Sequence, residues 1–312
     1  MKYNQLGNTE LKLSTLGYGA SPLGGVFDDI NEQDGINTVH AAIDAGINYI
    51  DVSPYYGLTK AETVLGKALK SVPRDKYIIS TKAGRYGSEL SDFDMSGARI
   101  RKSLDESLSR LGVDEVDILF LHDIEFVDPN IVKNEAIPCL EALRQEGKVK
   151  YIGVTGYPIK IFRDVASYAN IDCILSYCRY ALHDDSLRNL LPEFKNNKTG
   201  VINASPTAMG LLTERGAPSW HPATNELKAA CNKALVLCNK ANINLTQLAM
   251  QFAVSHSDIS STLVGTANPK NILNNVDWIT KPIDETLLAE VRAIFAPVNS
   301  TIWQTGLDIN AD

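Results

Sequence analysis

The sequence has few cysteines, no long apolar run and no excess of basic residues, and each absence excludes a class of protein. Its 5 cysteines are an odd number and none form a CxxC pair, so neither a disulfide framework nor a bound metal is indicated. The sequence has no run of about 18 apolar residues, the length that a membrane-spanning helix needs. The net charge of -7, from 30 Lys+Arg and 37 Asp+Glu, does not favour nucleic acid or an anionic membrane as a partner.

The composition is that of a globular protein, with 44% hydrophobic and 21% charged residues. The first residues, MKYNQLGNTELKLS, lack the apolar core of a secretory signal. We therefore expect a reduced, cytoplasmic protein, monomeric or homodimeric. A length of 312 residues suits one α/β barrel domain over residues 1–312.

Short β-rich runs alternate with amphipathic helical patterns along the chain, and alternating βα units favour a parallel sheet. Eight such units fit a closed (β/α)8 TIM barrel. A short N-terminal β-hairpin is expected from residues 3–6 and 11–13, which flank Gly7-Asn8. The expected strands are residues 16–18, 48–51, 77–81, 116–121, 150–155, 173–176, 201–204 and 261–264. The expected helices are residues 31–45, 61–69, 96–111, 130–146, 159–168, 186–196, 225–241 and 245–255.

The rival architecture is an open, doubly wound sheet that binds a dinucleotide. Such a sheet carries GxGxxG after its first strand. The glycines at that point, Gly17, Gly19, Gly24 and Gly25, do not have this spacing. The barrel is therefore favoured.

Polar residues end three otherwise apolar strands: Asp51, Lys82 and His122. In a (β/α)8 barrel the carboxyl ends of the strands carry the catalytic residues. Taken singly, each has a structural alternative, such as a helix cap for Asp51, an ion pair for Lys82 or a packing role for His122. Together with Tyr56 in the loop after the second strand, they predict a site.

The chemistry of this group is that of a tuned acid/base. A free Tyr hydroxyl titrates near about 10, and an ammonium beside it favours the phenolate and lowers its pKa. A carboxylate keeps the ammonium charged, and a histidine can bind the substrate oxygen. Hydride transfer to a nicotinamide fits this set better than hydrolysis. A Schiff base on Lys82, as in aldolases, is the alternative.

Three segments give the chain its resemblance to a known family. They are GINYIDVSPYYG at residues 46–57, STK at residues 80–82 and LHD at residues 121–123. Over essentially its whole length the chain resembles the aldo-keto reductases. The resemblance implies a tetrad of Asp51, Tyr56, Lys82 and His122. Tyr56 is its acid/base because it directly precedes Gly57.

Within the family, further segments resemble the aldose 1-dehydrogenases. They are LHDIEF (121–126), YIGVTG (151–156), LSYCRY (175–180), ASPTAMGLLT (204–213) and SWHP (219–222). This implies oxidation at C1 of L-galactose, or of a related sugar such as L-fucose or D-arabinose, to the lactone. The alternatives are a general aldehyde or ketone reductase and a nicotinamide-binding regulatory subunit with little turnover.

The positions that hold the nicotinamide depart from the common family pattern. Thr155-Gly156 stands in place of Ser-Asn, Tyr177 in place of an amide side chain, and Ala204 in place of the aromatic residue that stacks on the ring. Tyr177 is a candidate for the missing stacking surface, with core packing as the equal alternative. The resemblance implies cofactor contacts at Thr155, Ser176, Tyr177 and Ser205.

The segment after the last strand indicates NAD rather than NADP. NADP-preferring members place Lys and Arg where this chain has Gly265 and Asn271. A 2′-phosphate requires charge-assisted donors, which these two positions lack. For Lys270 two alternatives are open: contact with the phosphate, or exposure to solvent. The expected contacts of this segment are Gly265, Thr266, Asn268, Asn271 and Asn275, near a helix N-terminus.

Substrate contacts are expected from the loops that follow the strands. Asp123 could accept hydrogen bonds from sugar hydroxyls or orient its neighbours instead. The other candidates are Tyr55, Arg85, Trp220 and His221.

Overall fold

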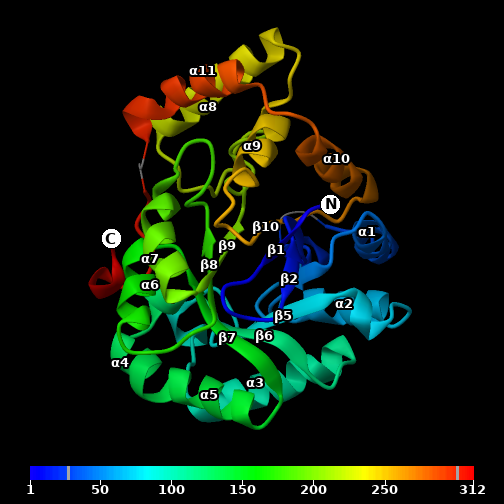
Figure 1. The fold of residues 1–312 in the computed structure, drawn as a ribbon, viewed down its shortest axis with the longest axis vertical. Helices are drawn as coiled ribbons and strands as arrows, with labels where there is room; N and C mark the ends of the chain where they lie inside the picture. The colour runs from blue at the N-terminus through cyan, green and yellow to red at the C-terminus, as the bar shows by residue number, and fades with distance from the viewer. Residues whose placement is uncertain (27–28, 300–301) are drawn as a thin grey trace.

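The computed structural model describes residues 1–26, 29–299 and 302–312. Eight parallel strands close into a barrel in the order β10-β3-β4-β5-β6-β7-β8-β9, with helices around it (Figure 1). The (β/α)8 prediction is confirmed. The strands are β3 (Leu16–Gly19), β4 (Tyr49–Asp51), β5 (Ile78–Ala83), β6 (Val116–Leu121), β7 (Val149–Gly156), β8 (Cys173–Tyr177), β9 (Gly200–Ala204) and β10 (Ser261–Val264).

The register of the strands brings their polar ends to one mouth of the barrel. Asp51 of β4 pairs with Ser80 of β5, and Lys82 of β5 pairs with Phe120 of β6. His122 directly follows β6, and its N–H donates to the Ala83 carbonyl at 2.9 Å. The polar ends of these three neighbouring strands therefore lie at the same rim of the barrel.

The helices lie outside the barrel, and α8 and α11 pack together at one end of the molecule (Figure 1). Several begin at side-chain caps, such as Asn31 before α1 and Ser96 before α3. The helices are α1 (Glu32–Asp44), α2 (Lys60–Leu69), α3 (Gly97–Leu111), α4 (Pro129–Ile131), α5 (Ile137–Gln145), α6 (Ile159–Ala166), α7 (Leu191–Asn197), α8 (Asn225–Lys240), α9 (Leu245–Ala253), α10 (Pro269–Thr280) and α11 (Glu285–Phe295).

The single helix predicted over residues 130–146 is interrupted. A π-helical turn, Val132–Ala136, separates α4 from α5. Pro138 follows this turn, and a proline has no N–H to donate and crowds the carbonyl four residues earlier. The wider turn accommodates the proline without ending the helical path.

The predicted N-terminal hairpin is confirmed as β1 (Tyr3–Gln5) paired antiparallel with β2 (Lys12–Ser14). Leu6 and Leu13 are fully buried and pack against the side chains inside the barrel, among them Tyr49 and Phe120. The hairpin thereby fills the end of the barrel opposite the polar rim.

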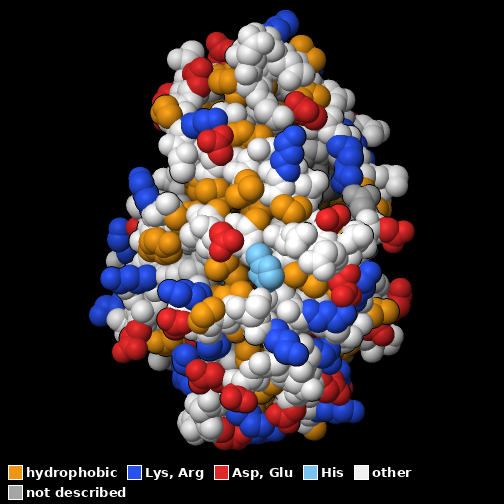
Figure 2. Space-filling model, turned by 90° about the vertical axis from the view of Figure 1, so that its right-hand side faces the viewer, with side chains coloured by type: hydrophobic (Ala, Val, Ile, Leu, Met, Phe, Trp, Pro, Cys, Tyr) orange, Lys and Arg blue, Asp and Glu red, His pale blue; other side chains and the backbone are white. Residues whose placement is uncertain are grey.

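All five cysteines are free thiols and all are buried: Cys139, Cys173, Cys178, Cys231 and Cys238. On the face seen in Figure 2, cationic and anionic side chains are interspersed. Across the described ranges, no helix combines the length and the apolar character needed to cross a membrane.

Candidate active site

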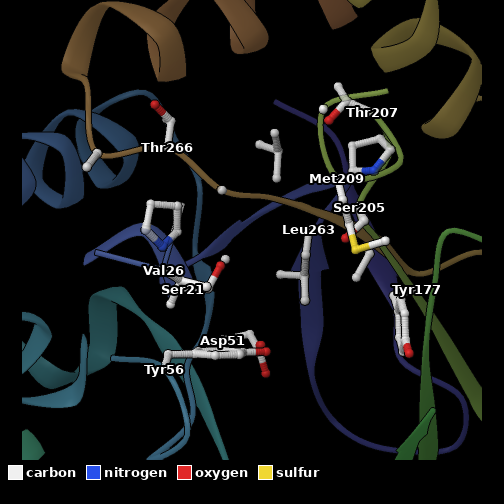
Figure 3. Close-up of a pocket in the computed structure, with 18 of the residues that line it drawn as sticks. Ser21, Val26, Asp51, Tyr56, Tyr177, Ser205, Thr207, Met209, Leu263 and Thr266 are labelled. Carbon is white, nitrogen blue, oxygen red and sulfur yellow. The ribbon is translucent and has the colours of Figure 1, made fainter. Parts of the chain in front are cut away.

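A cavity of about 1120 Å³ opens at the carboxyl ends of the strands. Asp51 and Tyr56 lie at one side of it and Tyr177 at the other, with Leu263 of β10 between them (Figure 3). The segment after β10 lines the far end of the cavity, at Thr266 in the figure, and Ser205 of the loop after β9 lies on the side of Tyr177. The predicted tetrad therefore lies at one side of the cavity.

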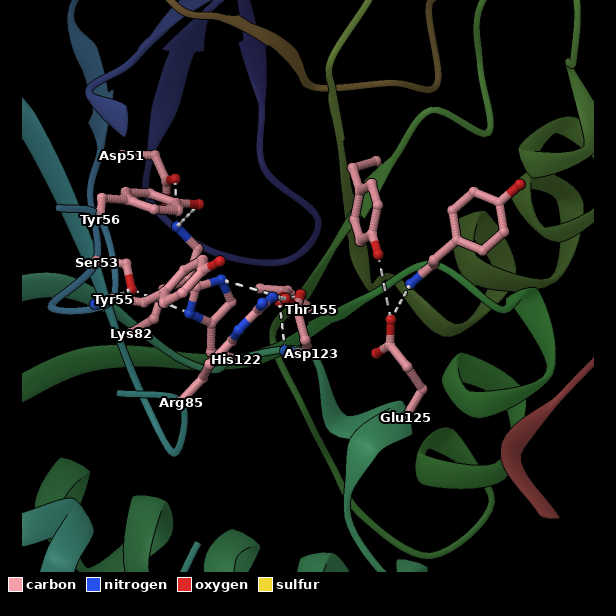
Figure 4. Close-up of polar contacts among 12 residues, drawn as sticks. Asp51, Ser53, Tyr55, Tyr56, Lys82, Arg85, His122, Asp123, Glu125 and Thr155 are labelled. Atoms are coloured by element: carbon pink, nitrogen blue, oxygen red, sulfur yellow. Dashed lines mark hydrogen bonds and ion pairs between the residues drawn. The ribbon is translucent and has the colours of Figure 1, made fainter. Parts of the chain in front are cut away.

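Lys82 is the centre of the tetrad and is almost fully buried. Its Nζ lies 2.5 Å from Asp51 Oδ2, donates to the Val52 carbonyl at 3.0 Å and donates to the Tyr56 hydroxyl at 3.1 Å (Figure 4). These are three acceptors for the three N–H bonds of an ammonium. The geometry fixes Lys82 as a charged donor to Tyr56.

A chain of hydroxyls below the tetrad holds Asp51 in place. Ser80 donates to Asp51 Oδ1 at 2.7 Å, and the Tyr49 hydroxyl lies 2.9 Å from Ser80 Oγ. All three side chains are buried in the barrel. Asp51 thus directs its other oxygen at Lys82.

Burial and charge oppose each other at Lys82 and Tyr56. Burial disfavours the charged ammonium, but Asp51 and Tyr56 raise the pKa of Lys82 above its ordinary value. Burial raises the pKa of Tyr56 to about 12, and Lys82 offsets this only in part. The predicted lowering of the Tyr56 pKa therefore does not occur in this structure, because loss of solvation outweighs the neighbouring ammonium.

His122 completes the group at the mouth. Its Nδ1 lies 2.9 Å from Ser53 Oγ, and its ring meets Tyr55 and Tyr56 edge-on at centroid distances of 5.8 and 5.6 Å. Burial lowers the pKa of His122 to about 3, so the imidazole is neutral at physiological pH. A neutral ring can offer one N–H to an oxygen in the cavity.

Asp123 and Arg85 form an ion pair beside His122, with Arg85 NH1 2.5 Å from Asp123 Oδ2. Thr155 donates to Asp123 Oδ1 at 3.1 Å and accepts from the Asp123 N–H at 2.9 Å. Burial disfavours the charged form of Asp123, but its neighbours His122, Arg85 and Thr155 hold the pKa of its carboxyl below the ordinary value. The Arg85 guanidinium also covers the Tyr55 ring at 3.8 Å. The side chains of this group that line the cavity are Tyr55, Arg85, Asp123 and Thr155.

Glu125 is a buried carboxyl behind the cavity wall that the sequence did not single out. Its buried carboxyl accepts from the Tyr157 N–H at 3.0 Å and from the Tyr177 hydroxyl at 3.4 Å (Figure 4). A Cβ on Gly156 would lie 2.6 Å from Glu125 Oε2, so the glycine makes room for this carboxyl. Burial and the charge of Asp123 raise the pKa of Glu125 well above its ordinary value. The sequence shows only an acidic residue three positions after His122.

The far end of the cavity fits a dinucleotide. Asn268 caps α10 by accepting from the Lys270 N–H at 2.9 Å, which leaves a helix N-terminus at the cavity wall. At Gly265 a Cβ would lie 3.0 Å from the Pro22 ring, so a side chain there would crowd this wall of the cavity. The predicted contacts that line the cavity are Thr155, Tyr177, Ser205, Gly265, Thr266, Asn268, Asn271 and Asn275.

Two predicted site residues lie outside the cavity. Leu175 and Tyr177 of β8 line it, and Ser176 between them points to the other face of the strand, where its hydroxyl is buried. His221 is buried within its loop, with Nε2 2.9 Å from the Ala208 carbonyl and Nδ1 accepting from Ala223. The neighbouring Trp220 lines the cavity and is 54% exposed. Neither Ser176 nor His221 faces the cavity in this structure.

The chain matches the model of the Aldo/keto reductase family over residues 15–296, and it belongs to that family. It is 48% identical over 314 residues to the L-galactose dehydrogenase of Arabidopsis thaliana, with 98% of each chain covered. It is 31% identical to the D-threo-aldose 1-dehydrogenase of a Pseudomonas species, over 92% of this chain and 96% of that one. The predicted resemblance is confirmed.

The fold is shared with solved members of the family. An aldo-keto reductase of Bacillus halodurans in its holo form superposes with a TM-score of 0.78 at 26% identity, and 100% of both chains is covered. This chain is thus an oxidoreductase of a family that uses nicotinamide cofactors, and its relatives include aldose dehydrogenases.

Proposed function

We propose that the protein oxidises an aldose at C1 to the lactone, with NAD as the cofactor and L-galactose or a related sugar as the substrate. The observation that carries the proposal is the contact of Lys82 with both Asp51 and Tyr56, with His122 at the same mouth. The dehydrogenase activities named for the most similar relatives support the choice of an aldose.

Tyr56 is the proposed acid/base. The cofactor, held by the residues of the far end of the cavity, supplies the hydride acceptor. Tyr56 takes the proton of the C1 hydroxyl, and the Lys82 ammonium stabilises the phenolate that must first form. Asp51 keeps the ammonium in place, and neutral His122 offers a hydrogen bond to the C1 oxygen. Because the pKa of Lys82 is raised, it stays protonated, which speaks against a Schiff-base aldolase.

Asp123 and Arg85 are the proposed contacts to the sugar hydroxyls. A polyol needs hydrogen-bond acceptors as well as donors, and Asp123 presents a charged acceptor whose position Arg85 and Thr155 fix. Tyr55 and Trp220 also line the cavity. Tyr177 supplies an aromatic wall opposite Tyr56, where it can face the nicotinamide.

The choice of NAD follows from the segment after β10. Gly265 and Asn271 line the cavity without a charge, and Lys270 is exposed and outside it. A 2′-phosphate would therefore lack its usual partners on this side. Arg215, on the loop after β9, is the cation to examine if NADP is nevertheless preferred.

A screen for NAD reduction over a panel of aldoses tests the proposal. We expect turnover with L-galactose or a related sugar and a higher kcat/KM for NAD than for NADP. Tyr56→Phe should lower kcat/KM by about 100-fold or more. Tyr168→Phe, a tyrosine outside the cavity, is the matched control. If no aldose is oxidised, or if Tyr56→Phe changes nothing, the proposed function is wrong.

A further inference from the structure

Ser53 lies directly behind His122, in the loop that follows β4. Its side chain is fully buried, and Tyr55 donates its backbone N–H to Ser53 Oγ at 3.1 Å. The His122 Nδ1 atom lies 2.9 Å from the same oxygen. Within residues 1–26, 29–299 and 302–312, these two contacts are the hydrogen bonds of the hydroxyl.

Counting protons separates the two tautomers of His122. A neutral imidazole carries one N–H, on Nδ1 or on Nε2. With the proton on Nδ1, Ser53 Oγ would accept from both His122 and Tyr55, and its own buried O–H would have no acceptor. With the proton on Nε2, Ser53 donates to Nδ1 while accepting from Tyr55, so both Nδ1 and the buried Ser53 O–H have a partner.

The other side of the ring favours the same tautomer. His122 Nε2 lies 3.6 Å from Asp123 Oδ2, and Arg85 and Thr155 keep that carboxylate in place. A lone pair on Nε2 would face this negative charge, whereas an N–H is attracted to it. This argument uses neither Ser53 nor Tyr55, so it is independent of the proton count.

We infer that Ser53 is a positioning residue, whose hydroxyl donates to His122 Nδ1 and thereby fixes the imidazole with its proton on Nε2. The Nε2–H then points into the cavity as a standing hydrogen-bond donor beside the Asp123 acceptor. That this N–H donates to the C1 oxygen of a sugar rests on the proposed function. The assignment of the tautomer does not rest on it.

The tautomer can be read without substrate or cofactor. The full chain is labelled with 15N-histidine, and long-range 1H–15N spectra distinguish Nδ1–H from Nε2–H rings. The chain has 5 histidines, and the spectrum of His122→Gln assigns the signal of interest. We expect the Nε2–H pattern for His122 between pH 6 and 9. An Nδ1–H pattern in the wild-type protein would overturn the inference.

Ser53→Ala removes the only proposed donor to Nδ1. We expect it to populate both tautomers of His122 and to lower kcat/KM for the aldose by about tenfold, with an unchanged Kd for NAD. Ser103→Ala is the matched control, since Ser103 is equally buried, on α3, and does not line the cavity. An unchanged His122 spectrum in Ser53→Ala, or a loss of kcat/KM below about threefold, would also overturn the inference.

The two proposals fail in different ways. A wild-type protein that oxidises no aldose contradicts the proposed function and leaves the spectra as the full test of Ser53. An active enzyme with an Nδ1–H ring contradicts the role of Ser53 and leaves the proposed function standing.

Discussion

Arg85 contacts Asp123 and Tyr55 at the same time, with NH1 2.5 Å from the Asp123 carboxylate and the guanidinium 3.8 Å above the Tyr55 ring. One cation therefore holds a charged acceptor and an aromatic face on the same wall of the cavity. The planar guanidinium can do both, whereas a lysine ammonium can satisfy only the carboxylate.

Replacing Arg85 by Lys should weaken substrate binding more than it slows turnover. We expect KM for the aldose to rise by about tenfold, with a smaller change in kcat, because Tyr55 and Asp123 lose their shared partner. Arg99→Lys is the matched control, since Arg99 lies 3.7 Å over Tyr86 and outside the cavity. Equal KM values for wild type and Arg85→Lys would contradict this role.

Asn271→Arg should shift cofactor preference toward NADP. Asn271 lines the far end of the cavity on α10, and an arginine there can form a charge-assisted hydrogen bond to a 2′-phosphate. We expect the ratio of kcat/KM for NADP to that for NAD to rise about tenfold. Asn274→Arg adds the same charge to the same helix outside the cavity and should leave the ratio unchanged. A similar shift in both variants would indicate a general charge effect instead.

The raised pKa of Tyr56 predicts a pH dependence for oxidation that reduction does not share. Below its pKa of about 12 the residue is protonated, so the base form needed for oxidation grows as pH rises. We expect kcat/KM for sugar oxidation to increase from pH 7 to 9. Lactone or aldehyde reduction, which uses the protonated form, should stay nearly flat over this range. Oxidation that slows as pH rises would show that Tyr56 is not the base.

The free energy of unfolding of Glu125→Gln, relative to that of the wild-type protein, should increase as pH rises. The folded-state pKa of Glu125 is raised, so the unfolded chain releases its proton first, and wild-type stability is lost above the ordinary pKa of 4.5. Glutamine has no such proton. The difference in unfolding free energy, variant minus wild type, should therefore grow by about 1.4 kcal/mol per pH unit between that value and the raised folded-state pKa. Urea unfolding at pH 4, 6 and 8 measures it, and a difference that does not change with pH would mean that Glu125 is ionised when folded.

The barrel and the tetrad could be predicted because their signals are local. Asp51, Lys82 and His122 stand out as polar ends of apolar strands, and parallel strands bring such ends to one rim. Ser176 could have been excluded on the same grounds, since side chains alternate along a strand and Leu175 and Tyr177 face the cavity.

What could not be predicted depends on contacts between distant segments. Ser53 and His122 are 69 residues apart, and Glu125 meets Tyr177 52 residues further along. The pKa of Tyr56 was predicted in the wrong direction, because the sequence displays the neighbouring lysine but not the depth of burial. His221 was assigned to the substrate because an irregular loop gives no periodicity from which its inward turn could be seen.

The burial of all five thiols makes them a built-in reporter of structural opening. A thiol reagent can modify Cys139, Cys173, Cys178, Cys231 or Cys238 only when the surrounding elements separate, so the modification rate of each follows the frequency of that local event. Cys178 is the residue after Tyr177, whose side chain lines the cavity. If a ligand in the cavity slows the modification of the Cys178 thiol, the rate of modification reports how much of the protein has ligand bound. This measurement uses the native chain without an introduced label.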